Sequence, residues 1–456
     1  FAAKAAVGFS TGLRHALFEH IQKLSFSEMD TVGTSTLITR MTSDINQTQN
    51  GVNLVLRLFL RSPFIVFGAM IMAFTIDVKA ALVFVVTIPL LSIVVFGIML
   101  VSIPLYKKVQ SALDKVLGIT RENLTGSRVI RAFNKEDDEI TDFNNSNDAL
   151  TKIQLYVGKI SALMNPLTYV IINGAVVVLV WTGAIRVNSG YITQGEVVAL
   201  VNYMSQILVE LIKLANLIIN INKSIACGNR IQAIFELQPS ITDNAMTPVA
   251  EKKAEHSGEV PEVVFSHVGL TYAGAGEESL TDIDFTVKKG ETIGIIGGTG
   301  SGKSSVVNLI PRFYDATKGS VQIGGKDVRE YSLEELRGKI GMVLQKAVLF
   351  KGTIRENMLW GNENATDEDI MQALEVAQAK EFVDKKEGGL DFEIEQGGKN
   401  LSGGQRQRMT IARAVVKKPD ILILDDSASA LDFATDAKLR MAIRDMENKA
   451  TVFIVS

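Results

Sequence analysis

Two stretches of the chain, residues 80–103 and 160–185, contain no charged side chain. At about 1.5 Å of rise per residue, a helix over the first stretch is about 36 Å long, which is enough to cross a bilayer with some tilt. A buried helix of a soluble protein is the alternative, but two uncharged runs of this length favour membrane-spanning helices. Pro89 lies inside the first stretch and can kink that helix.

Two weaker apolar stretches, residues 62–76 and 197–209, bring the expected number of membrane crossings to four. Lys and Arg are unevenly distributed between the connections: residues 106–159 carry nine of them, whereas the turns at 77–79 and 186–196 carry one each. The positive-inside rule therefore places residues 106–159 in the cytoplasm. Apolar residues in this connection keep a helical spacing, so we expect helices that extend into the cytosol and pack against something there.

Residues 1–26 predict a helix, because apolar residues recur on one face of it. The sequence does not start with Met, and this helix resembles the water-exposed end of a longer one, so we expect N-terminal membrane helices to be missing from it. A break at residues 30–34 precedes a second helix that leads into the first crossing. Arg57 and Arg61 lie one turn apart on it, and they either snorkel to the membrane interface or serve the passage of a substrate.

The chain is too long for one domain, since a single core seldom serves more than about 250–300 residues and this sequence has 456. We expect a helical transmembrane domain over residues 1–237, an irregular, charged linker over 238–262 and a soluble domain over 263–456. The soluble domain contains short β-like runs, several of them separated by helical segments, which is typical of a mainly parallel α/β sheet. These runs are residues 263–268, 285–287, 292–296, 321–323, 341–344, 421–424 and 451–455.

Charge and cysteine content exclude some classes of protein. The net charge is −3, and no basic stripe suited to nucleic acid is present, so we expect no nucleic-acid partner. Cys227 is the only cysteine, which rules out an internal disulfide and agrees with a soluble domain in a reducing cytosol. A small buried apolar role for Cys227 is favoured over a reactive thiol.

Residues 297–305, GGTGSGKSS, match the phosphate-binding loop G-x-x-x-x-G-K-[ST] without a substitution. The glycines let backbone N–H groups turn toward a phosphate, a lysine supplies a positive charge, a serine hydroxyl can bind Mg²⁺, and the following helix adds its positive end. The motif therefore predicts that the soluble domain binds a nucleoside triphosphate. Its residues are Gly297, Gly298, Thr299, Gly300, Ser301, Gly302, Lys303, Ser304 and Ser305.

Two further polar residues follow predicted strands. Asp425 ends the apolar run 421–424, an arrangement that holds Mg²⁺ opposite a phosphate loop, although acidic residues at strand ends are common. Gln345 directly follows residues 341–344, where its amide can reach the metal and an attacking water; a surface glutamine is the alternative.

The most specific signal lies at residues 401–405, LSGGQ, which precede Arg406 and a predicted helix. The hydroxyl and N–H donors at such a helix start suit a γ-phosphate. Because the chain already has one phosphate loop, this second anion site is best explained as serving another subunit, in a head-to-tail pair of nucleotide domains. Its residues are Leu401, Ser402, Gly403, Gly404 and Gln405.

Together these motifs resemble the ATP-binding cassette (ABC) transporters, and among them the exporters that fuse membrane and nucleotide domains in one chain. The resemblance covers essentially the whole sequence. It implies an all-α transmembrane bundle with long cytoplasmic extensions, followed by an α/β P-loop ATPase domain, with ATP and Mg²⁺ as cofactors.

The resemblance also assigns roles to single residues. Tyr272 matches the aromatic residue that stacks on adenine; without the family, ordinary strand core is the less favoured alternative. The loop 297–304 matches the Walker A motif, Gln345 the Q-loop, residues 401–405 the signature, Asp425 the Walker B aspartate and residues 429–432 the D-loop. Residues 26–33 and roughly 120–133 fall where such exporters place the coupling helices that touch the nucleotide domains. Lys303, Gln345 and the residue after Asp425 are the implied catalytic groups.

The sequence departs from the family's pattern at two points. Asp426 occupies the position of the usual catalytic glutamate, and the sequence stops at Ser456, directly before the expected switch histidine, so we expect the domain to be truncated there. Asp is one carbon shorter than Glu, roughly 1.5 Å of reach, and a general base must come within hydrogen-bond distance of its water. A misplacement of about 1 Å can cost about a hundredfold in rate, which predicts a slow, degenerate site on this chain.

The signature is intact, whereas the Walker motifs of this chain are followed by Asp426 in place of the catalytic glutamate. This combination favours the hypothesis that the chain is one half of a heterodimeric multidrug-type exporter. A homodimer that tolerates Asp426 is the alternative. We expect a multi-pass protein of the plasma membrane, with its nucleotide domain in the cytoplasm, that exports a small hydrophobic or amphipathic substrate. A homodimeric lipid or peptide exporter, a cassette-regulated channel and a soluble cassette ATPase acting on DNA are the rival hypotheses. The uncharged stretches and the lack of a basic face argue against the last of these.

Overall fold

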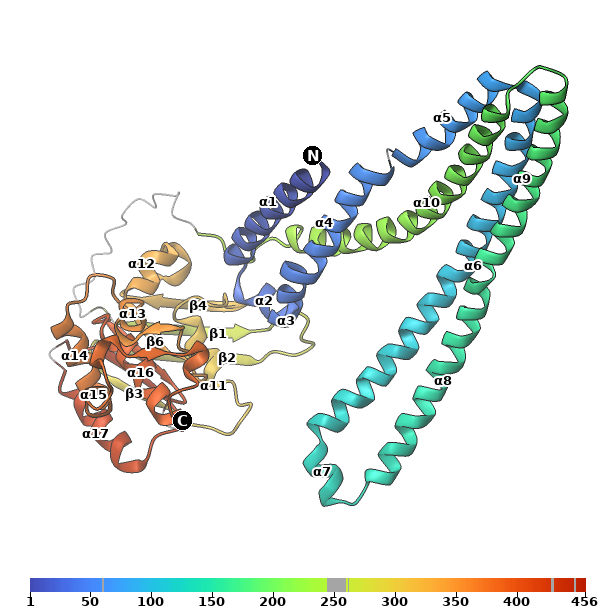
Figure 1. The fold of residues 1–456 in the computed structure, drawn as a ribbon. Coiled ribbons are helices and arrows are strands. Elements are labelled where there is room, and N and C mark those ends of the chain that lie inside the picture. Colours follow the sequence, from blue (N-terminus) through green and yellow to red (C-terminus); the bar gives the residue numbers. More distant parts are fainter. Residues whose placement is uncertain (60, 244–259, 261, 428–429, 447) are drawn as a thin grey trace. The chain divides into compact units, whose positions relative to one another are not determined.

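Figure 1 shows the computed structural model of the chain, which describes residues 1–59, 61–243, 260, 262–427, 430–446 and 448–456. These residues form two compact units. The first comprises residues 1–22 and 35–236, and the second comprises residues 23–34 and 237–456. Most of the expected linker, residues 238–262, lies outside the described residues.

The first unit is built from helices. Their bounds are α1 (Ala2–Lys23), α3 (Thr34–Thr39), η1 (Arg40–Asp44), α4 (Ile45–Leu54), η2 (Val55–Phe59), α5 (Arg61–Ile76), α6 (Val78–Thr125), α7 (Ser127–Ala132), α8 (Glu136–Ala162), α9 (Met164–Asn188) and α10 (Gln194–Phe235).

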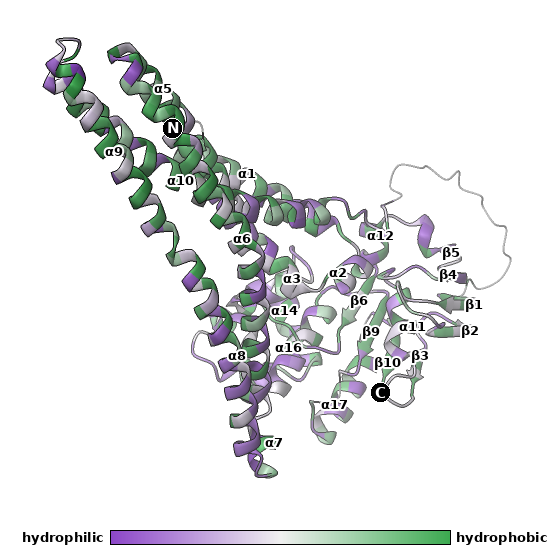
Figure 2. Ribbon diagram, turned by 90° about the vertical axis from the view of Figure 1, so that its right-hand side faces the viewer, coloured by the Kyte–Doolittle hydropathy of each residue, from purple (hydrophilic) through white to green (hydrophobic). Residues whose placement is uncertain are grey.

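The described residues contain four helical stretches that are long and apolar enough to cross a membrane, as the sequence predicts. Large apolar side chains cover their outer faces: Phe64, Val86 and Trp181 are 78%, 70% and 73% exposed. Figure 2 shows this apolar character along α5, α9 and α10. A helix that is apolar on its exposed face as well as on its packed face suits a lipid environment. The four stretches are Thr34–Ile76, Val78–Thr125, Glu136–Asn188 and Gln194–Leu214.

A continuous core joins α5, α6, α9 and α10, with Phe84, Leu91 and Leu200 fully buried in it. At one end of these helices, Asp77 begins α6 by accepting a hydrogen bond from the backbone N–H of Ala80 at 2.9 Å. The same carboxylate accepts a hydrogen bond from Nε of Arg186, near the end of α9, at 2.8 Å. This ion pair ties the turn between α5 and α6 to α9.

Helix α6 is 48 residues long and continues through Pro89 and Pro104 well beyond the uncharged stretch. The short helix α7 reverses the chain, and α8 then packs against α6 (Figure 1). The first turn of α8 is acidic, and the apolar residues in this part of the hairpin are scattered among charged ones. The expected helical extension of residues 106–159 is therefore present.

A buried polar cluster connects η1 and α10. The Asp44 carboxylate, 3% exposed, accepts hydrogen bonds from Nε of Arg230 at 3.0 Å and from Arg40 at 2.8 Å. Cys227 is buried next to this pair, and burial raises the pKa of its thiol, which fits the structural role expected for it.

The N-terminal region corrects one boundary. The sequence predicts a helix to residue 26 and a break at 30–34, whereas α1 ends at Lys23 and a second helix, α2 (Phe26–Val32), follows. A local cap explains the difference, because the side chain of Glu28 accepts a hydrogen bond from the backbone N–H of Ser25 and starts a new helix there. Gly33, at φ +78°, then ends it. We call residues 23–34 the α2 segment, and this segment belongs to the second unit.

A parallel sheet with strand order β3-β10-β9-β6 forms the centre of the second unit: β3 (Thr292–Ile295), β10 (Thr451–Val455), β9 (Ile421–Asp425) and β6 (Ile340–Val343). Alternate residues of β9 enter opposite cores. Ile421 and Ile423 pack on one face with α11, whereas Leu422 and Leu424 pack on the other with the helices of residues 354–415. A sheet buried on both faces needs such a continuous apolar run.

A second sheet is antiparallel, with order β2-β1-β4-β5, so the expectation of a mainly parallel sheet is wrong for this half of the domain. Its strands are β1 (Val263–Leu270), β2 (Leu280–Val287), β4 (Lys318–Ile323) and β5 (Lys326–Asp327). The loop between β1 and β2 spans only residues 271–279 and holds no helix, so it makes a hairpin rather than a parallel crossover.

Helix α11 (Lys303–Leu309) packs in the core that both sheets share. All seven strands expected from the sequence are present, and the short strands β5, β7 and β8 were not anticipated. The remaining elements are η3 (Val328–Glu330), α12 (Leu333–Gly338), β7 (Gly352–Thr353), α13 (Ile354–Leu359), α14 (Asp367–Val376), α15 (Lys380–Asp384), η4 (Gly389–Asp391), β8 (Glu393–Ile394), η5 (Gln396–Gly398), α16 (Gly403–Val415) and α17 (Phe433–Arg444).

Candidate nucleotide-binding site

The parallel strands end in register at one edge of their sheet. Val455 pairs with both Ile295 and Asp425, and Val343 pairs with Leu424. The segments that leave this edge include the phosphate loop (residues 297–304), Gln345 and Asp426. A ligand site of an open α/β sheet lies at this carboxyl edge, because the loops of several strands converge there.

These segments enclose a cavity of about 630 Å³. The structure thus brings together the predicted phosphate loop, the two aspartates, the glutamine and the tyrosine, which lie far apart in the sequence. Its lining residues are Tyr272, Glu278, Ser279, Gly297, Thr299, Gly300, Ser301, Gly302, Lys303, Ser304, Ser305, Gln345, Asp425, Asp426, Val455 and Ser456.

The phosphate loop needs glycine at two kinds of position. Gly300 and Gly302 have φ of +82° and +85°, a conformation that other residues rarely adopt. A Cβ on Gly297 would approach Oγ of Ser301 to 2.7 Å. Nζ of Lys303 donates hydrogen bonds to the carbonyls of Gly297 and Gly298 at 2.7 and 2.9 Å, so its charge is held over the loop.

Asp425 is 4% exposed at the end of β9, and its Oδ1 accepts a hydrogen bond from Oγ of Ser304 at 3.0 Å. Burial raises the pKa of this carboxyl above its ordinary value, and the charge of Asp426 adds to the effect. A buried carboxylate facing a hydroxyl at the start of a helix forms a pair of hard oxygen donors. Such a pair can hold Mg²⁺ together with phosphate oxygens.

Asp426 lies one residue beyond the strand, at φ +47°, and its backbone N–H donates to the carbonyl of Val455 at 3.2 Å. Aspartate is among the few residues that tolerate this left-handed conformation. Nε2 of Gln345 donates to Oδ2 of Asp426 at 3.2 Å. The glutamine is exposed but lines the cavity, and it contacts the carboxylate at the expected position of the general base.

Tyr272 lies in the loop between β1 and β2, and its hydroxyl donates to Oγ of Ser305 at 2.8 Å. The tyrosine is half-buried. Its side chain packs against the core of the two sheets and also forms part of the cavity wall. An aromatic ring in this place is available to stack on a base whose phosphates sit in the loop.

The signature segment (residues 401–405) is not among the residues that line this cavity. It starts α16 through a reciprocal cap: Oγ of Ser402 accepts from the N–H of Gln405 at 3.2 Å, and Oε1 of Gln405 accepts from the N–H of Ser402 at 3.1 Å. Gly404 lies close to Ala430 of the predicted D-loop, and a Cβ on it would come within 3.0 Å of the carbonyl of that residue. Ser429, part of the predicted D-loop, lies outside the described residues.

Sequence reasoning missed some residues of the site. Glu278, Ser279, Val455 and Ser456 line the cavity without a recognisable motif, because they arrive from a hairpin loop and a strand end. For Val455 and Ser456 the predicted strand 451–455 was the available signal, since a residue that ends or follows a central parallel strand reaches the same edge.

Family comparisons agree with this architecture. The profile of the ABC transporter transmembrane region matches residues 1–211, and that of the ABC transporter matches residues 280–429. The chain is 37% identical to an uncharacterized ABC transporter ATP-binding protein of Mycobacterium tuberculosis over 459 residues, covering 100% of this chain and 77% of that protein. It is 33% identical to an ATP-dependent lipid A-core flippase of Desulfotalea psychrophila, covering 97% of this chain and 76% of the flippase.

Two more similarities concern function and fold. A Bacillus subtilis protein whose name describes a candidate multidrug export ATP-binding/permease protein is 34% identical, covering 97% of this chain and 76% of that protein. The structure of a bacterial Atm1-family ABC exporter with ATP bound has a TM-score of 0.75 at 21% identity, covering 99% of this chain and 78% of that one. The chain therefore belongs to the ABC transporter family and carries a transmembrane region and an ATPase domain on one polypeptide, in the fold of an ABC exporter.

Proposed function

We propose that this chain is one half of an exporter dimer that uses ATP to move a hydrophobic or amphipathic compound, such as a drug-like molecule, a lipid or a peptide, across the plasma membrane. Residues 1–237 serve as its transmembrane domain, 238–262 as its linker and 263–456 as its nucleotide domain on the cytoplasmic side. One observation carries the proposal: the phosphate loop lines the cavity, whereas the signature segment of the same chain does not. A second cassette subunit must therefore bring a signature to this cavity.

The cavity fits Mg-ATP. Tyr272 would stack on adenine, the phosphate loop would bind the β- and γ-phosphates, and Ser304, Asp425 and Gln345 would surround Mg²⁺. The described residues contain no group of three or more His, Cys, Asp or Glu side chains able to hold a metal ion by themselves. Mg²⁺ usually takes one or two carboxylates plus phosphate oxygens, so Asp425 with a hydroxyl and an amide is a sufficient set. The bound metal would neutralise charge on the transferred phosphoryl group.

The residues of the chain would divide the remaining work. Lys303 would balance the phosphate charge, and Asp426 would accept the proton of the attacking water. Gln345 contacts the Asp426 carboxylate and would fix its direction. Since Asp426 is shorter than glutamate by roughly 1.5 Å, we infer that hydrolysis at this site is slow and that this chain's signature completes a faster site on its partner.

A heterodimer is therefore favoured over a homodimer that tolerates Asp426. Amphipathic substrates are supported by relatives named for lipid A-core flipping and for multidrug export. A homodimeric lipid or peptide exporter is the second candidate. A cassette-regulated channel is the third, and ATP-dependent uptake into inverted vesicles, as opposed to passive conductance, separates a pump from it.

Two substitutions test the unequal dimer. The tagged full-length protein is purified from its native membrane, its associated cassette subunit is identified, and ATP turnover of the complex is measured. Ser402→Ala removes a donor aimed at the partner's γ-phosphate, so we expect turnover to fall by about 100-fold or more. Lys303→Ala disables only the slow site, and we expect turnover to fall less than about threefold.

Equal and severe losses in the two variants, with no second subunit present, would support the homodimer instead. A variant such as Lys399→Ala, which removes an exposed charge close to the signature, serves as the control and keeps full turnover. If Ser402→Ala had no effect, the composite site itself would be wrong.

A further inference from the structure

Tyr314 lies between the nucleotide cavity and the α2 segment, and no motif draws attention to it. It follows α11 in the loop that leads to β4 and is half-buried. Burial raises the pKa of its hydroxyl, so the group stays protonated and able to donate a hydrogen bond at neutral pH. Its ring and its hydroxyl contact different parts of the second unit.

The ring of Tyr314 supports the side chain expected to hold adenine. The rings of Tyr314 and Tyr272 meet edge to face, with centroids 5.0 Å apart and an angle of 89°. Tyr272 is also anchored through its hydroxyl to Ser305 beside the phosphate loop. A rotation of the Tyr272 ring therefore has to move Tyr314 or break this contact.

The hydroxyl of Tyr314 donates to the carboxylate of Asp30 in α2. Phe26, at the start of α2, packs its ring 4.4 Å from that of Phe313 and 6.3 Å from that of Tyr314. Two contacts, one apolar and one charge-assisted, thus seat the α2 segment on the loop that carries Tyr314.

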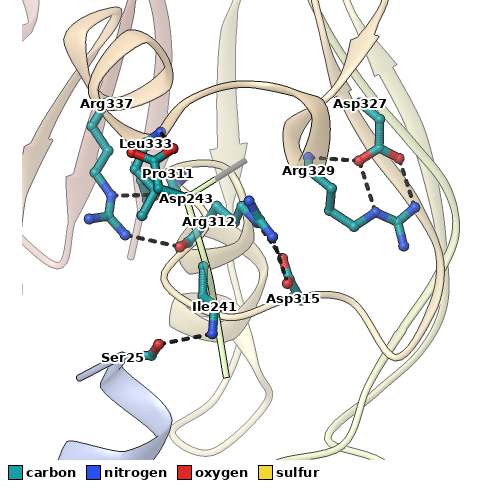
Figure 3. A network of polar contacts seen from close by, with 10 residues as sticks. All are labelled: Ser25, Ile241, Asp243, Pro311, Arg312, Asp315, Asp327, Arg329, Leu333 and Arg337. Carbon is teal, nitrogen blue, oxygen red and sulfur yellow. Dashed lines mark hydrogen bonds and ion pairs between the residues drawn. The ribbon is translucent and has the colours of Figure 1, made fainter. Parts of the chain in front are cut away.

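Figure 3 shows further bonds that hold the α2 segment and the start of the same loop. Oγ of Ser25 accepts from the backbone N–H of Ile241 at 3.0 Å, which ties the α2 segment to the chain that enters the nucleotide domain. Arg337 in α12 donates to the carbonyls of Pro311 and Arg312 at 3.2 and 3.1 Å. These bonds fix the start of the loop on α12 and the α2 segment on the chain near Ile241, while the side chains of Phe313 and Tyr314 contact α2.

Two cavities share Tyr272 as a wall. One is the nucleotide cavity, and the other, of about 220 Å³, is lined by Ser27 of α2, Ile241, Phe313 and Tyr314 among others. Tyr314 also lines the second cavity, and its ring contacts that of Tyr272.

We propose that Tyr314 is a positioning residue that couples adenine stacking on Tyr272 to the seating of the α2 segment through its edge-to-face contact and its bond to Asp30. The proposal rests on the nucleotide site proposed above and deepens it. By linkage, if a seated α2 segment favours the stacking orientation of Tyr272, then a bound base favours the seated α2 segment by the same factor. In the chain, α2 connects α1 to α3 of the membrane unit. Binding of the base would therefore influence that unit through α2, independently of phosphate binding.

Comparing ATP with inorganic tripolyphosphate isolates the contribution of the base. The full-length protein in lipid nanodiscs is titrated with each ligand plus Mg²⁺, and Kd is measured for wild type, Tyr314→Phe and Asp30→Asn. Tyr314→Phe keeps the ring but loses the hydroxyl. We expect ATP to bind about tenfold more weakly in both variants, whereas Kd for tripolyphosphate stays within about twofold.

A second readout follows the α2 segment itself. In wild type, ATP should slow hydrogen exchange of the amides of residues 26–32 more than tripolyphosphate does, and Tyr314→Phe should abolish this difference. Tyr331→Phe is the matched control, because it removes another buried tyrosine hydroxyl of the same domain, bonded to the carbonyl of Ile323 at 2.8 Å. It should lower thermal stability without changing the ratio of the two Kd values.

The outcomes separate the two proposals. If wild type binds neither ligand, the proposed nucleotide site fails. If wild type binds both but Tyr314→Phe weakens them equally, or changes only the melting temperature, the site stands and the role of Tyr314 is overturned.

Discussion

The phosphate loop and the signature segment are both glycine-rich, both carry a serine, and both start a helix, yet the fold uses them in opposite ways. The phosphate loop meets groups from distant parts of the chain: Ser304 bonds Asp425, and Gln345 reaches the neighbouring Asp426. The signature instead closes on itself, since Ser402 and Gln405 bond each other. The comparison teaches that one motif belongs to a cavity already assembled within the chain, whereas the other caps its own helix and does not line that cavity.

The largest expected effect is on the rate of ATP hydrolysis at the site that contains this chain's phosphate loop. With Ser402→Ala present to silence the partner's site, Asp426→Glu should raise the residual ATP hydrolysis by up to about 100-fold, because the longer side chain reaches the water. Glutamate tolerates the left-handed backbone at this position less well, so a loss of about 1 kcal/mol in unfolding free energy should accompany the gain. Phosphate release from the purified complex is the measurement, with Asp445→Glu as a surface control. A rate that does not increase would remove the argument from side-chain length.

A smaller effect is expected on the affinity of the loop. Lys303→Ala removes a charge-assisted contact to phosphate, worth about 1.5–3 kcal/mol, so the Kd for ATP at this site should rise about 10- to 100-fold. Lys399→Ala, next to the signature, should leave that Kd unchanged. Titration with a fluorescent ATP analogue measures both variants. An unchanged Kd in Lys303→Ala would contradict the assignment of the phosphate loop.

We expect Asp425→Asn to weaken Mg²⁺-dependent ATP binding and to raise the unfolding free energy. Burial raises the pKa of Asp425, so its ionised form opposes folding; without nucleotide, stability should rise as pH falls from neutral through that pKa. The amide can still accept the bond from Ser304 and carries no charge, so unfolding free energy at pH 7 should increase by about 0.5–2 kcal/mol and depend less on pH. Mg²⁺-dependent ATP affinity should fall. Thermal unfolding between pH 5 and 8 gives the answer, and a destabilised Asp425→Asn protein would refute the burial argument.

The smallest expected effect is on the unfolding free energy when glycines of the signature are replaced, and Gly403 and Gly404 form a matched pair for this test. A Cβ on Gly404 would lie 3.0 Å from the carbonyl of Ala430, whereas nothing lies within 4 Å of a Cβ on Gly403. Gly404→Ala should therefore cost about 1 kcal/mol in unfolding free energy, and Gly403→Ala should be neutral or slightly stabilising. Urea denaturation of both variants is sufficient. Equal costs would show that the close approach to the D-loop is not what requires glycine there.

Local patterns predicted the elements that depend on neighbouring residues. The uncharged stretch at residues 80–103 and the apolar run at 421–424 each specify a helix or a strand, because burial or lipid contact follows directly from composition. The break expected at 30–34 is present but is confined to Gly33, because a cap from Glu28 to Ser25 starts the short helix α2, which runs to Val32. The antiparallel sheet was also missed, since short runs do not reveal their pairing partner.

The sequence by itself determined the membrane-spanning helices, the phosphate loop and the signature, because each depends on residues that follow one another within one helix or turn. Only the tertiary structure decided which of them meet. It placed Gln345 against Asp426 and Tyr314 between Tyr272 and Asp30, and it kept Ser402 out of the cavity that holds Lys303. Such contacts join residues tens to hundreds of positions apart, and they follow from how the sheets and helices bury their apolar faces rather than from any local pattern.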